Sequence, residues 1–312
     1  MQEHKKYDYI FAGFGASACI LVHELSRKGL LDNKKILAID PSLKTVNDKT
    51  YCFWSRQEDA ITKDFAPLAS HSWTKIGIDQ ETPQEIAPLT YYHINSLDLY
   101  SSAKNILALH EGLFLNTAVK GFITAESTVI ETEGGSYEGE VIYDGRPPSQ
   151  EDSNPSYQNI LQSFIGYKIK LNGKKLDPTA CTLMDFNVDQ QEQTQFIYVL
   201  PFSDDTALVE LTRFGSDPIS EIASKQILDN YIKTHFGEYE RIDKELGVIP
   251  MYMDLKPPKP FKNVVPIGTR ANKVKPSTGY AFKNMYAHAK EIANNAKGVN
   301  SPSRFRLYDR LL

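Results

Sequence analysis

A short glycine-rich segment near the start of the chain has the residue types and spacing of a phosphate-binding turn. Gly13, Gly15 and Ala18 form the pattern Gly-x-Gly-x-x-Ala directly after an apolar segment, residues 7–11. The first glycine permits a tight turn, the second lets the backbone approach a pyrophosphate, and the alanine allows a helix to pack closely on a strand. The N-terminus of that helix adds amide donors and a favourable dipole. The pattern predicts a dinucleotide site, and a glycine-rich turn without a ligand is the alternative.

Asp40 is the acid that such a site needs further along the chain. It follows a second apolar segment, residues 35–39, and lies 22 residues after Ala18. At this distance an acid can bind the hydroxyl groups of an adenosine ribose. We therefore expect Asp40 to contribute to the same cofactor site as Gly13 and Gly15.

Two downstream segments favour FAD over NAD as the dinucleotide. Gly268 follows a late apolar segment, residues 263–267, and in FAD-binding folds of this kind such a glycine lies near the ribityl chain. Thr278 and Gly279 precede the last expected helix, which would then point at the flavin. The sequence holds one dinucleotide fingerprint, so a reduced nicotinamide cofactor would have no fold of its own here.

One carboxylate lies among aliphatic residues, where it could carry proton chemistry. Glu210 stands between Val209 and Leu211 in a segment that has the composition of a strand. An apolar site raises the pKa of a carboxyl group and keeps its proton available near neutral pH. A half-buried strand whose glutamate faces water is the other interpretation, and the residues alone leave both open.

The spacing of apolar residues places these groups on two kinds of element. Residues 7–11 and 35–39 are expected strands that flank a helix over 17–28, and this β-α-β unit favours a parallel sheet. After a polar, proline-rich segment, residues 147–155, the pattern changes to short strands joined by turns, which indicates an antiparallel sheet. These strands are expected over residues 165–171, 180–186, 196–200 and 207–214.

The order of these elements predicts an α/β fold with two interleaved parts. We expect a Rossmann-like FAD-binding domain with a parallel sheet, and an interleaved substrate domain built on an antiparallel β-sheet. The FAD-binding domain is assigned to residues 1–50, 95–150 and 245–312, and the substrate domain to 51–94 and 151–244. Residues 42–94 are expected to be rich in loops, and further helices are expected over 97–109, 219–236 and 279–296.

Composition excludes several classes of function. The net charge of −4 gives no electrostatic reason to expect nucleic acid as a partner. Cys19, Cys52 and Cys181 are widely spaced, which fits neither a metal site nor a disulfide framework and suits a reducing cytoplasm. The sequence contains no run of about 18 apolar residues, so no transmembrane helix is expected.

Seven short segments, taken together, resemble the lycopene cyclase family of carotenoid biosynthesis, and they follow the family's order across nearly the whole chain. They are residues 47–54 (NDKTYCFW), 143–147 (YDGRP), 183–186 (LMDF), 196–203 (FIYVLPFS), 207–212 (ALVELT), 247–250 (GVIP) and 276–280 (PSTGY). The resemblance implies an isomerase of the intramolecular lyase type that binds reduced FAD and converts the acyclic ends of lycopene to β-ionone rings. A proton adds to an end-group alkene, the carbocation closes the ring and another proton leaves, so no electrons are consumed overall.

The resemblance also implies roles for particular residues. Glu210 matches the first acid of the family's paired-acid motif and becomes the expected catalytic residue, whereas Leu211 stands where the family commonly has a second acid. Asp185 is the acid that could compensate, and Arg146 is expected to serve the flavin or its domain contacts. Aromatic faces could stabilise the cation, although clustered aromatic residues often form core instead. The candidates are Tyr51, Phe53, Trp54, Tyr91 and Tyr92.

The implied substrate and cofactor lead to further expectations. Lycopene dissolves in membranes, so we expect a cytoplasmic protein that docks on the inner face of the cell membrane without crossing it. NAD(P)H is expected as the reductant that keeps the flavin reduced. A flavin-dependent monooxygenase or reductase of the same fold, acting on an apolar substrate, is the rival interpretation. A protein that binds carotenoid without catalysis is a third.

Overall fold

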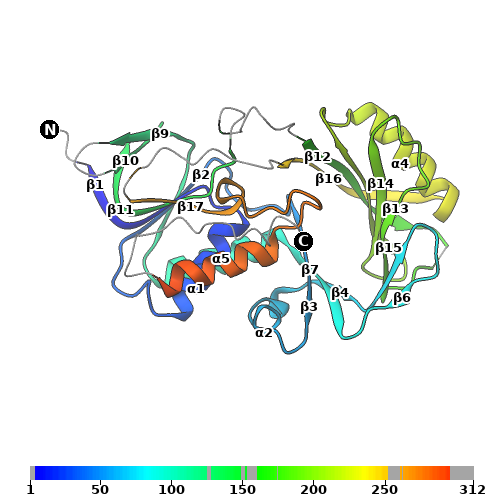
Figure 1. Ribbon diagram of the computed structural model, residues 1–312, viewed down its shortest axis with the longest axis horizontal. Helices are drawn as coiled ribbons and strands as arrows, with labels where there is room; N and C mark the ends of the chain where they lie inside the picture. The colour runs from blue at the N-terminus through cyan, green and yellow to red at the C-terminus, as the bar shows by residue number, and fades with distance from the viewer. Residues whose placement is uncertain are drawn as a thin grey trace. The chain divides into compact units, whose positions relative to one another are not determined.

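The computed structural model describes residues 4–124, 128–148, 152, 160–173, 175–251, 261 and 263–295, and the chain divides into two compact units (Figure 1). Unit 1 consists of Met1–Asn47, Asn95–Tyr157 and Met253–Leu312, and unit 2 consists of Asp48–Ile94 and Gln158–Tyr252. Each unit is assembled from segments that are distant in the sequence, as expected for two interleaved parts. Most of the polar segment 147–155 lies outside the described residues.

The structural division differs from the predicted one at three places, one of which is the boundary after residue 150, since unit 1 extends to Tyr157. Residues 48–50 and 245–251 belong to unit 2, whereas the sequence placed them with the dinucleotide motif. The difference at residues 245–251 arises because strand β16 (Tyr239–Met251) pairs with β12 (Ile160–Leu171) along its length. Glu245 therefore lies in the antiparallel sheet of unit 2.

Unit 1 is built around a mixed sheet with the strand order β8-β2-β1-β11-β10-β9, and β17 pairs with β11. The strands β8, β2, β1, β11 and β17 are parallel. Strand β2 and the carboxyl-terminal halves of β1 and β11 are mostly apolar and buried, because both faces of such a sheet are covered. The strands are β1 (Lys5–Ala12), β2 (Ile36–Asp40), β8 (Leu113–Asn116), β9 (Val119–Thr124), β10 (Thr128–Thr132), β11 (Ser136–Asp144) and β17 (Val264–Pro266).

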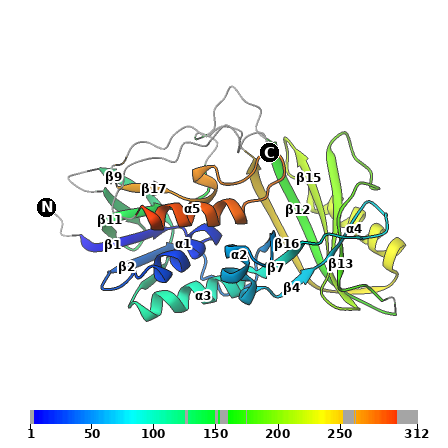
Figure 2. The ribbon, with the colours of Figure 1, turned by 60° about the horizontal axis from the view of Figure 1, so that its bottom comes forward.

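Three helices of unit 1 pack together. Helix α1 (Ala16–Arg27) lies between α3 (Ser96–Leu109) and α5 (Phe282–Asn294), as Figure 2 shows. A short 3-10 turn, η3 (Gly268–Ala271), follows β17 and also contacts α1. The β1-α1-β2 unit thus brings the glycine-rich turn to the carboxyl ends of β1 and β2, which is where open parallel sheets bind ligands.

Unit 2 is built around a sheet with the strand order β16-β12-β15-β14-β13-β5-β6. All pairs are antiparallel except β5 with β13. The remaining strands are β5 (Lys75–Ile78), β6 (Gln84–Glu85), β13 (Ala180–Asp185), β14 (Thr194–Pro201) and β15 (Thr206–Gly215). The predicted antiparallel sheet is confirmed, and β12 and β16 extend it well beyond the expected strands.

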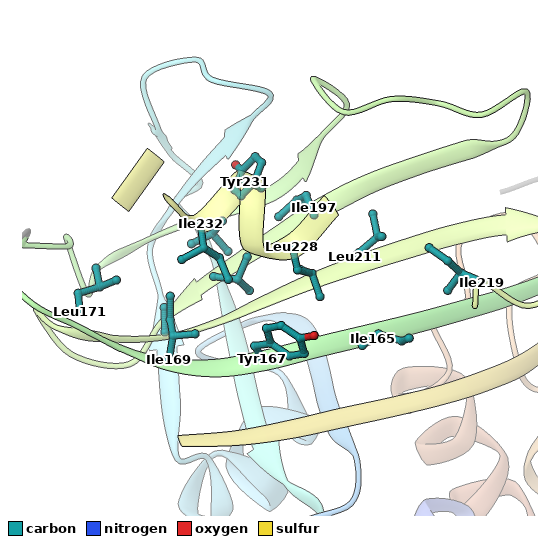
Figure 3. Packing of buried hydrophobic residues seen from close by; sticks show 13 residues of the cluster. Ile165, Tyr167, Ile169, Leu171, Ile197, Leu211, Ile219, Leu228, Tyr231 and Ile232 are labelled. Atoms are coloured by element: carbon teal, nitrogen blue, oxygen red, sulfur yellow. The ribbon is translucent and has the colours of Figure 1, made fainter. Parts of the chain in front are cut away.

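Helix α4 (Glu221–Phe236) covers one face of this sheet (Figure 3). The helix starts at Ser220, whose hydroxyl accepts a hydrogen bond from the Ala223 amide, and it ends at Gly237, whose φ is +84°. Leu211 from β15 packs with Leu228 from α4 in the resulting core. Since side chains alternate along a strand, Leu208, Glu210 and Thr212 point to the opposite face.

Residues 42–94 form more regular structure than predicted. They contain β3 (Thr50–Arg56), α2 (Ala60–Phe65), η1 (Ala66–Leu68), β4 (His71–Trp73) and β7 (Leu89–Asn95) besides β5 and β6. The strands β3, β7 and β4 make a small third sheet. Their short length and polar flanks hide the strand pattern in the sequence. Among the described residues, no helix combines the length and the apolar character that crossing a bilayer requires.

Candidate active site

Gly13 has a backbone conformation and a packing environment that only glycine satisfies. Its φ is +91°, and a Cβ atom there would lie 3.0 Å from the carbonyl carbon of Gly145 and 3.1 Å from the amide nitrogen of Arg146. The Gly13 amide donates to the carbonyl oxygen of Ile39 over 2.8 Å. The turn is therefore held between β2 and the residues that follow β11.

Gly15, unlike Gly13, is required neither by its backbone conformation nor by close packing. Its φ is −89°, which any residue adopts, and no atom lies within 4 Å of the position that a Cβ would take. Gly15 is also the N-cap of α1 and offers no side chain to the first helical amides. These amides and the helix dipole suit a phosphate. Ala18 is fully buried within α1, in keeping with the predicted close packing.

Asp40 fixes the glycine-rich turn from the end of β2. Its Oδ2 accepts a hydrogen bond from the Phe14 amide over 2.7 Å, and its Oδ1 accepts one from the Ser42 amide over 2.9 Å. Lys44 Nζ lies 3.2 Å from Oδ1. The carboxylate thus shapes the turn, and its predicted contact with a ribose stays a prediction.

Of the downstream residues Gly268, Thr278 and Gly279, Gly268 lies against the first turn of α1. Gly268 has a φ of +63°, and a Cβ there would lie 2.5 Å from Ser17 Oγ in the first turn of α1. Thr278 and Gly279 lie in a turn before α5, where the Gly279 amide donates to the Lys275 carbonyl oxygen over 2.9 Å. The structure therefore brings Gly268 to the dinucleotide motif and leaves the cofactor contacts of Thr278 and Gly279 as predictions.

Arg146 is bound to the protein itself. Its Nε and Nη2 donate to the two oxygens of Asp144 over 2.8 and 2.9 Å, and its guanidinium carbon lies 4.3 Å from the centre of the Phe122 ring. Arg270 Nε lies 3.3 Å from the same carboxylate and donates to the Arg146 carbonyl oxygen. The two arginines neutralise Asp144 beside the glycine-rich turn. A flavin contact of Arg146 stays a prediction.

These residues fit a pyrophosphate-containing dinucleotide. The space at Gly15, the uncapped start of α1 and the close approach of Gly268 are what a phosphate bridge requires. Asp40 holds the turn in place before any ligand binds.

Glu210 lies in a buried and largely apolar position in unit 2. Its side chain is 9% exposed, and Thr212 Oγ1 donates to Glu210 Oε1 over 2.9 Å. Burial, followed by the charge of Glu245 and a hydrogen bond with it, raises the pKa of Glu210 well above its ordinary value. Thr212 and the positive charge of Lys49 act in the opposite direction and are outweighed. The water-facing interpretation of this glutamate is therefore wrong.

Glu245 is the residue that sequence reasoning missed. Gly166 in β12 pairs with Glu210 on one side and with Glu245 on the other. A Cβ at Gly166 would lie 3.2 Å from Glu210 Cβ and 3.1 Å from Glu245 Cγ. The absent side chain thus gives the two glutamates room to meet above the middle strand. A glycine inside an apolar strand often marks such a close approach, and it was the available signal.

Aromatic side chains cover the face of the sheet that carries Glu210. Leu208, two residues before Glu210, packs in a cluster with Trp73 and Tyr91. The Trp54 and Tyr91 rings are 4.5 Å apart, and the Trp73 and Tyr91 rings are 5.7 Å apart.

The remaining predicted aromatic residues lie nearby in unit 2. Phe53 and Tyr92 stack on each other at 5.1 Å, and Tyr51 lies on β3. Tyr198, which the sequence did not single out, is the direct cross-strand neighbour of Glu210.

Asp185, the other candidate for the catalytic acid, is held by hydrogen bonds within unit 2. Its side chain is fully buried, Tyr231 OH donates to Oδ2 over 2.7 Å, and the Asn187 amide and side chain donate to Oδ1. Burial alone would raise the pKa of Asp185, but these hydrogen bonds and His235 lower it below its ordinary value. Asp185 therefore anchors α4 as an ionised carboxylate on the face opposite to Glu210.

The fold places the chain among proteins with the architecture of flavin-dependent enzymes. A geranylgeranyl bacteriochlorophyll reductase-like protein from Thermoplasma acidophilum has a TM-score of 0.67 at 14% identity, covering 95% of this chain and 79% of that one. A flavin-dependent brominase has a TM-score of 0.60 at 14% identity, covering 96% and 82%. At such identities the likeness concerns the fold.

Sequence comparison then defines the family. The profile of the lycopene cyclase protein family matches residues 8–304, so the chain belongs to this family. The lycopene beta-cyclase of Pseudescherichia vulneris is 28% identical over 78% of this chain and 64% of its own length. The lycopene beta-cyclase of Pantoea ananas is 26% identical over 94% and 75%, and that of Capsicum annuum is 27% identical over 92% and 60%. The chain thus spans between three fifths and three quarters of the length of these relatives.

Proposed function

We propose that the protein is a lycopene cyclase that holds reduced FAD in unit 1 and forms β-ionone rings from the acyclic ends of lycopene. Membership of the lycopene cyclase family supports this function. The observation that carries the chemistry is the buried Glu210, whose pKa is raised well above its ordinary value by burial and by the neighbouring carboxyl group of Glu245, which favours its protonated form. A cyclase needs such an acid, because the reaction begins with a proton added to an alkene.

The dinucleotide turn of unit 1 supports the assignment of FAD. Gly13 and Gly15 would face the pyrophosphate, and the first turn of α1 would donate amide hydrogens to it. Asp40, Arg146 and Gly268 would complete the surroundings of the cofactor. When bound, a reduced and anionic flavin supplies a negative charge that stabilises a carbocation in a dry site.

Glu210 would act as general acid and then as general base. Its carboxyl proton adds to the end-group alkene, the resulting cation closes the ring, and the Glu210 carboxylate takes up the proton that leaves the ring. The sum is an isomerisation without oxidant or reductant. A raised pKa makes Glu210 a weaker acid, so the cation itself must also be stabilised, and the aromatic faces around Leu208 can contribute about 0.5–2 kcal/mol each.

The substrate determines where the protein works. Lycopene resides in membranes, so the protein would dock peripherally on the inner face of the cell membrane from the cytoplasm. NAD(P)H would serve only to bring the flavin into its reduced state before turnover.

Pigment analysis tests this function directly. The chain is expressed in bacteria that accumulate lycopene, with Glu210→Gln as the matched control. We expect pigments with β-rings from the parent chain and unchanged lycopene from the variant. Unchanged lycopene with a folded, FAD-loaded parent chain would refute the cyclase, and oxidised or reduced carotenoids would instead support a redox flavoenzyme.

A further inference from the structure

We propose that Glu245 is a positioning residue that forms a carboxyl pair with Glu210 and holds the proton on it for cyclisation. This inference rests on the proposed function and adds a second acid to it. The pair is assembled from two strands that are separated by β12 in the sheet and lie 35 residues apart in the sequence.

The strand register brings the two carboxyl groups together. Neighbouring strands are about 4.8 Å apart, so the backbones of Glu210 and Glu245 are separated by about 10 Å across β12. Both residues pair with Gly166, and their side chains converge where that residue has none. The neighbouring Lys244 points the other way, because its ammonium group contacts Glu221 of α4. Glu245 therefore lies on the Glu210 face of the sheet.

The hydrogen bonds of the two glutamates leave one position for a shared proton. Thr212 donates to Glu210 Oε1, and Thr50 Oγ1 donates to Glu245 Oε2 over 2.9 Å. Glu245 Oε1 is buried, and no N–H or O–H donor of the described residues reaches it. Two carboxyl groups form a hydrogen bond only when one of them is protonated, since an ionised carboxylate has no donor. A proton between Glu210 and Glu245 satisfies this oxygen.

The second acid that the family commonly has directly after the first would not serve this purpose here. Leu211 is fully buried and packs against α4, on the face opposite to Glu210 (Figure 3). An acidic side chain at position 211 would therefore point away from Glu210. Glu245 supplies the second carboxyl group from the correct face.

After the carboxyl pair has donated its proton to the alkene, it can take up another proton from the ring. With one proton on the pair, Glu245 carries the negative charge and Glu210 is neutral. Transfer of the proton to the alkene carbon leaves two adjacent carboxylates, whose repulsion makes them a stronger base than either alone. The pair then takes a proton from the ring carbon, the ring alkene forms, and the single proton is restored. The negative charge of Glu245 also attracts the intermediate cation.

Other ionisable groups on this face modify the pair without replacing it. Lys49, which precedes β3, opposes the raised pKa of Glu210 through its positive charge. Burial raises the pKa of Cys52, so this thiol stays uncharged. Tyr198 of β14 lies directly beside Glu210, and further along the sheet β12 contributes Lys168 and β16 contributes Asp243.

The test compares Glu245→Gln with Glu240→Gln, an exposed glutamate on the same strand. Cyclisation by the FAD-loaded protein is measured against pH, and the protonated carboxyl band is titrated by infrared difference spectroscopy, with Glu210→Gln to assign it. Loss of the partner charge lowers the pKa of Glu210. We therefore expect the alkaline decline of the rate, and the loss of the infrared band, to move down by at least about one pH unit in Glu245→Gln. Glu240→Gln should leave both unchanged.

The outcomes separate this inference from the proposed function. A Glu245→Gln rate that falls equally at all pH values, with an unmoved infrared titration, would show a purely structural role and overturn the pair. A shifted infrared titration in a protein that forms no rings would support the pair and refute the cyclase. Thermal unfolding of each variant confirms that unit 2 is intact, and Thr50→Val, which removes the hydroxyl donor to Glu245 Oε2, provides a milder second perturbation.

Discussion

The dinucleotide turn of unit 1 and the carboxyl pair of unit 2 are assembled in different ways. Gly13, Gly15 and Ala18 lie within six consecutive residues, and the local conformation of the chain alone brings them together. Glu210 and Glu245 meet only because β15 and β16 both pair with β12 in a particular register. A local site can be predicted from spacing, whereas a site made by strand register requires the fold.

The two regions also respond differently to charge. The turn of unit 1 offers backbone amides and a helix dipole to a negatively charged ligand. Unit 2 instead places Glu245 beside the buried Glu210, and this arrangement raises the pKa of Glu210 and favours its protonated form. The first region is therefore suited to binding an anion, and the second to donating a proton.

The largest effect is expected for Glu210→Gln, which separates chemistry from binding. Glutamine keeps the shape of the side chain and can form hydrogen bonds, but it cannot donate and take up the proton. The rate of cyclisation should therefore fall by about a hundredfold to ten-thousandfold. Flavin content should be unchanged. Steady-state rates and flavin absorbance measure the two effects.

Asp185→Asn is the matched control for this variant. Its hydrogen bonds to Tyr231 and Asn187 predict a loss of stability of about 1–3 kcal/mol with the chemistry retained. Near parental cyclisation by Glu210→Gln together with loss of activity in Asp185→Asn would assign the acid to Asp185 instead.

Gly15→Val should abolish FAD binding at the dinucleotide turn of unit 1. The Cβ position at Gly15 is open and its φ is accessible to valine, so the apoprotein should fold with a stability change within about 1 kcal/mol. The added side chain fills the space assigned to the pyrophosphate, and FAD binding should be lost. Flavin titration of the apoprotein provides the measurement.

Gly13→Ala is the control for Gly15→Val, because it should lower the stability of the fold instead of filling the cofactor site. A Cβ at Gly13 meets the backbone of Gly145, and the φ of +91° is strained for alanine, so this variant should lose stability of the protein itself. Full flavin retention by Gly15→Val would show that the cofactor lies elsewhere.

Gly166→Ala should have a smaller effect that is confined to unit 2. The added methyl group meets Leu208 Cδ1 at 2.9 Å as well as the side chains of both glutamates, which costs about 1–3 kcal/mol and separates the acids. We expect the alkaline decline of the rate to move to lower pH although both acids remain. Gly247→Ala is the control for crowding alone, because its methyl group meets the Phe164 ring. Equal pH profiles for the two variants would contradict the role assigned to Gly166.

The sequence predicted the β-α-β unit almost to the residue. The expected helix over 17–28 corresponds to α1 (Ala16–Arg27), and the expected strand over 35–39 corresponds to β2 (Ile36–Asp40). Both elements are governed by local apolar spacing and by the turn between them. The buried environment of Glu210 also agrees with its apolar neighbours.

Strand β16 and the partner of Glu210 could not be predicted in the same way. Residues 239–245 of β16 are mostly polar, and the apolar residues that follow are interrupted by Gly247 and Pro250, so this edge strand lacks the uninterrupted apolar run that indicates a strand. The register between β16 and β12 depends on pairing between distant parts of the sequence, and Gly166 and Glu245 are 79 residues apart. Only the unexpected glycine at position 166 carried information about this approach.

The proposed absence of net redox chemistry is tested most directly by stoichiometry. FAD bound to the protein is reduced chemically under anaerobic conditions, lycopene is supplied in vesicles, and rings formed per flavin are counted without added NAD(P)H while the flavin spectrum is followed. We predict many rings per flavin and a flavin that stays reduced throughout. Ring formation that stops at one per flavin, or that consumes one reductant per ring, would contradict the account.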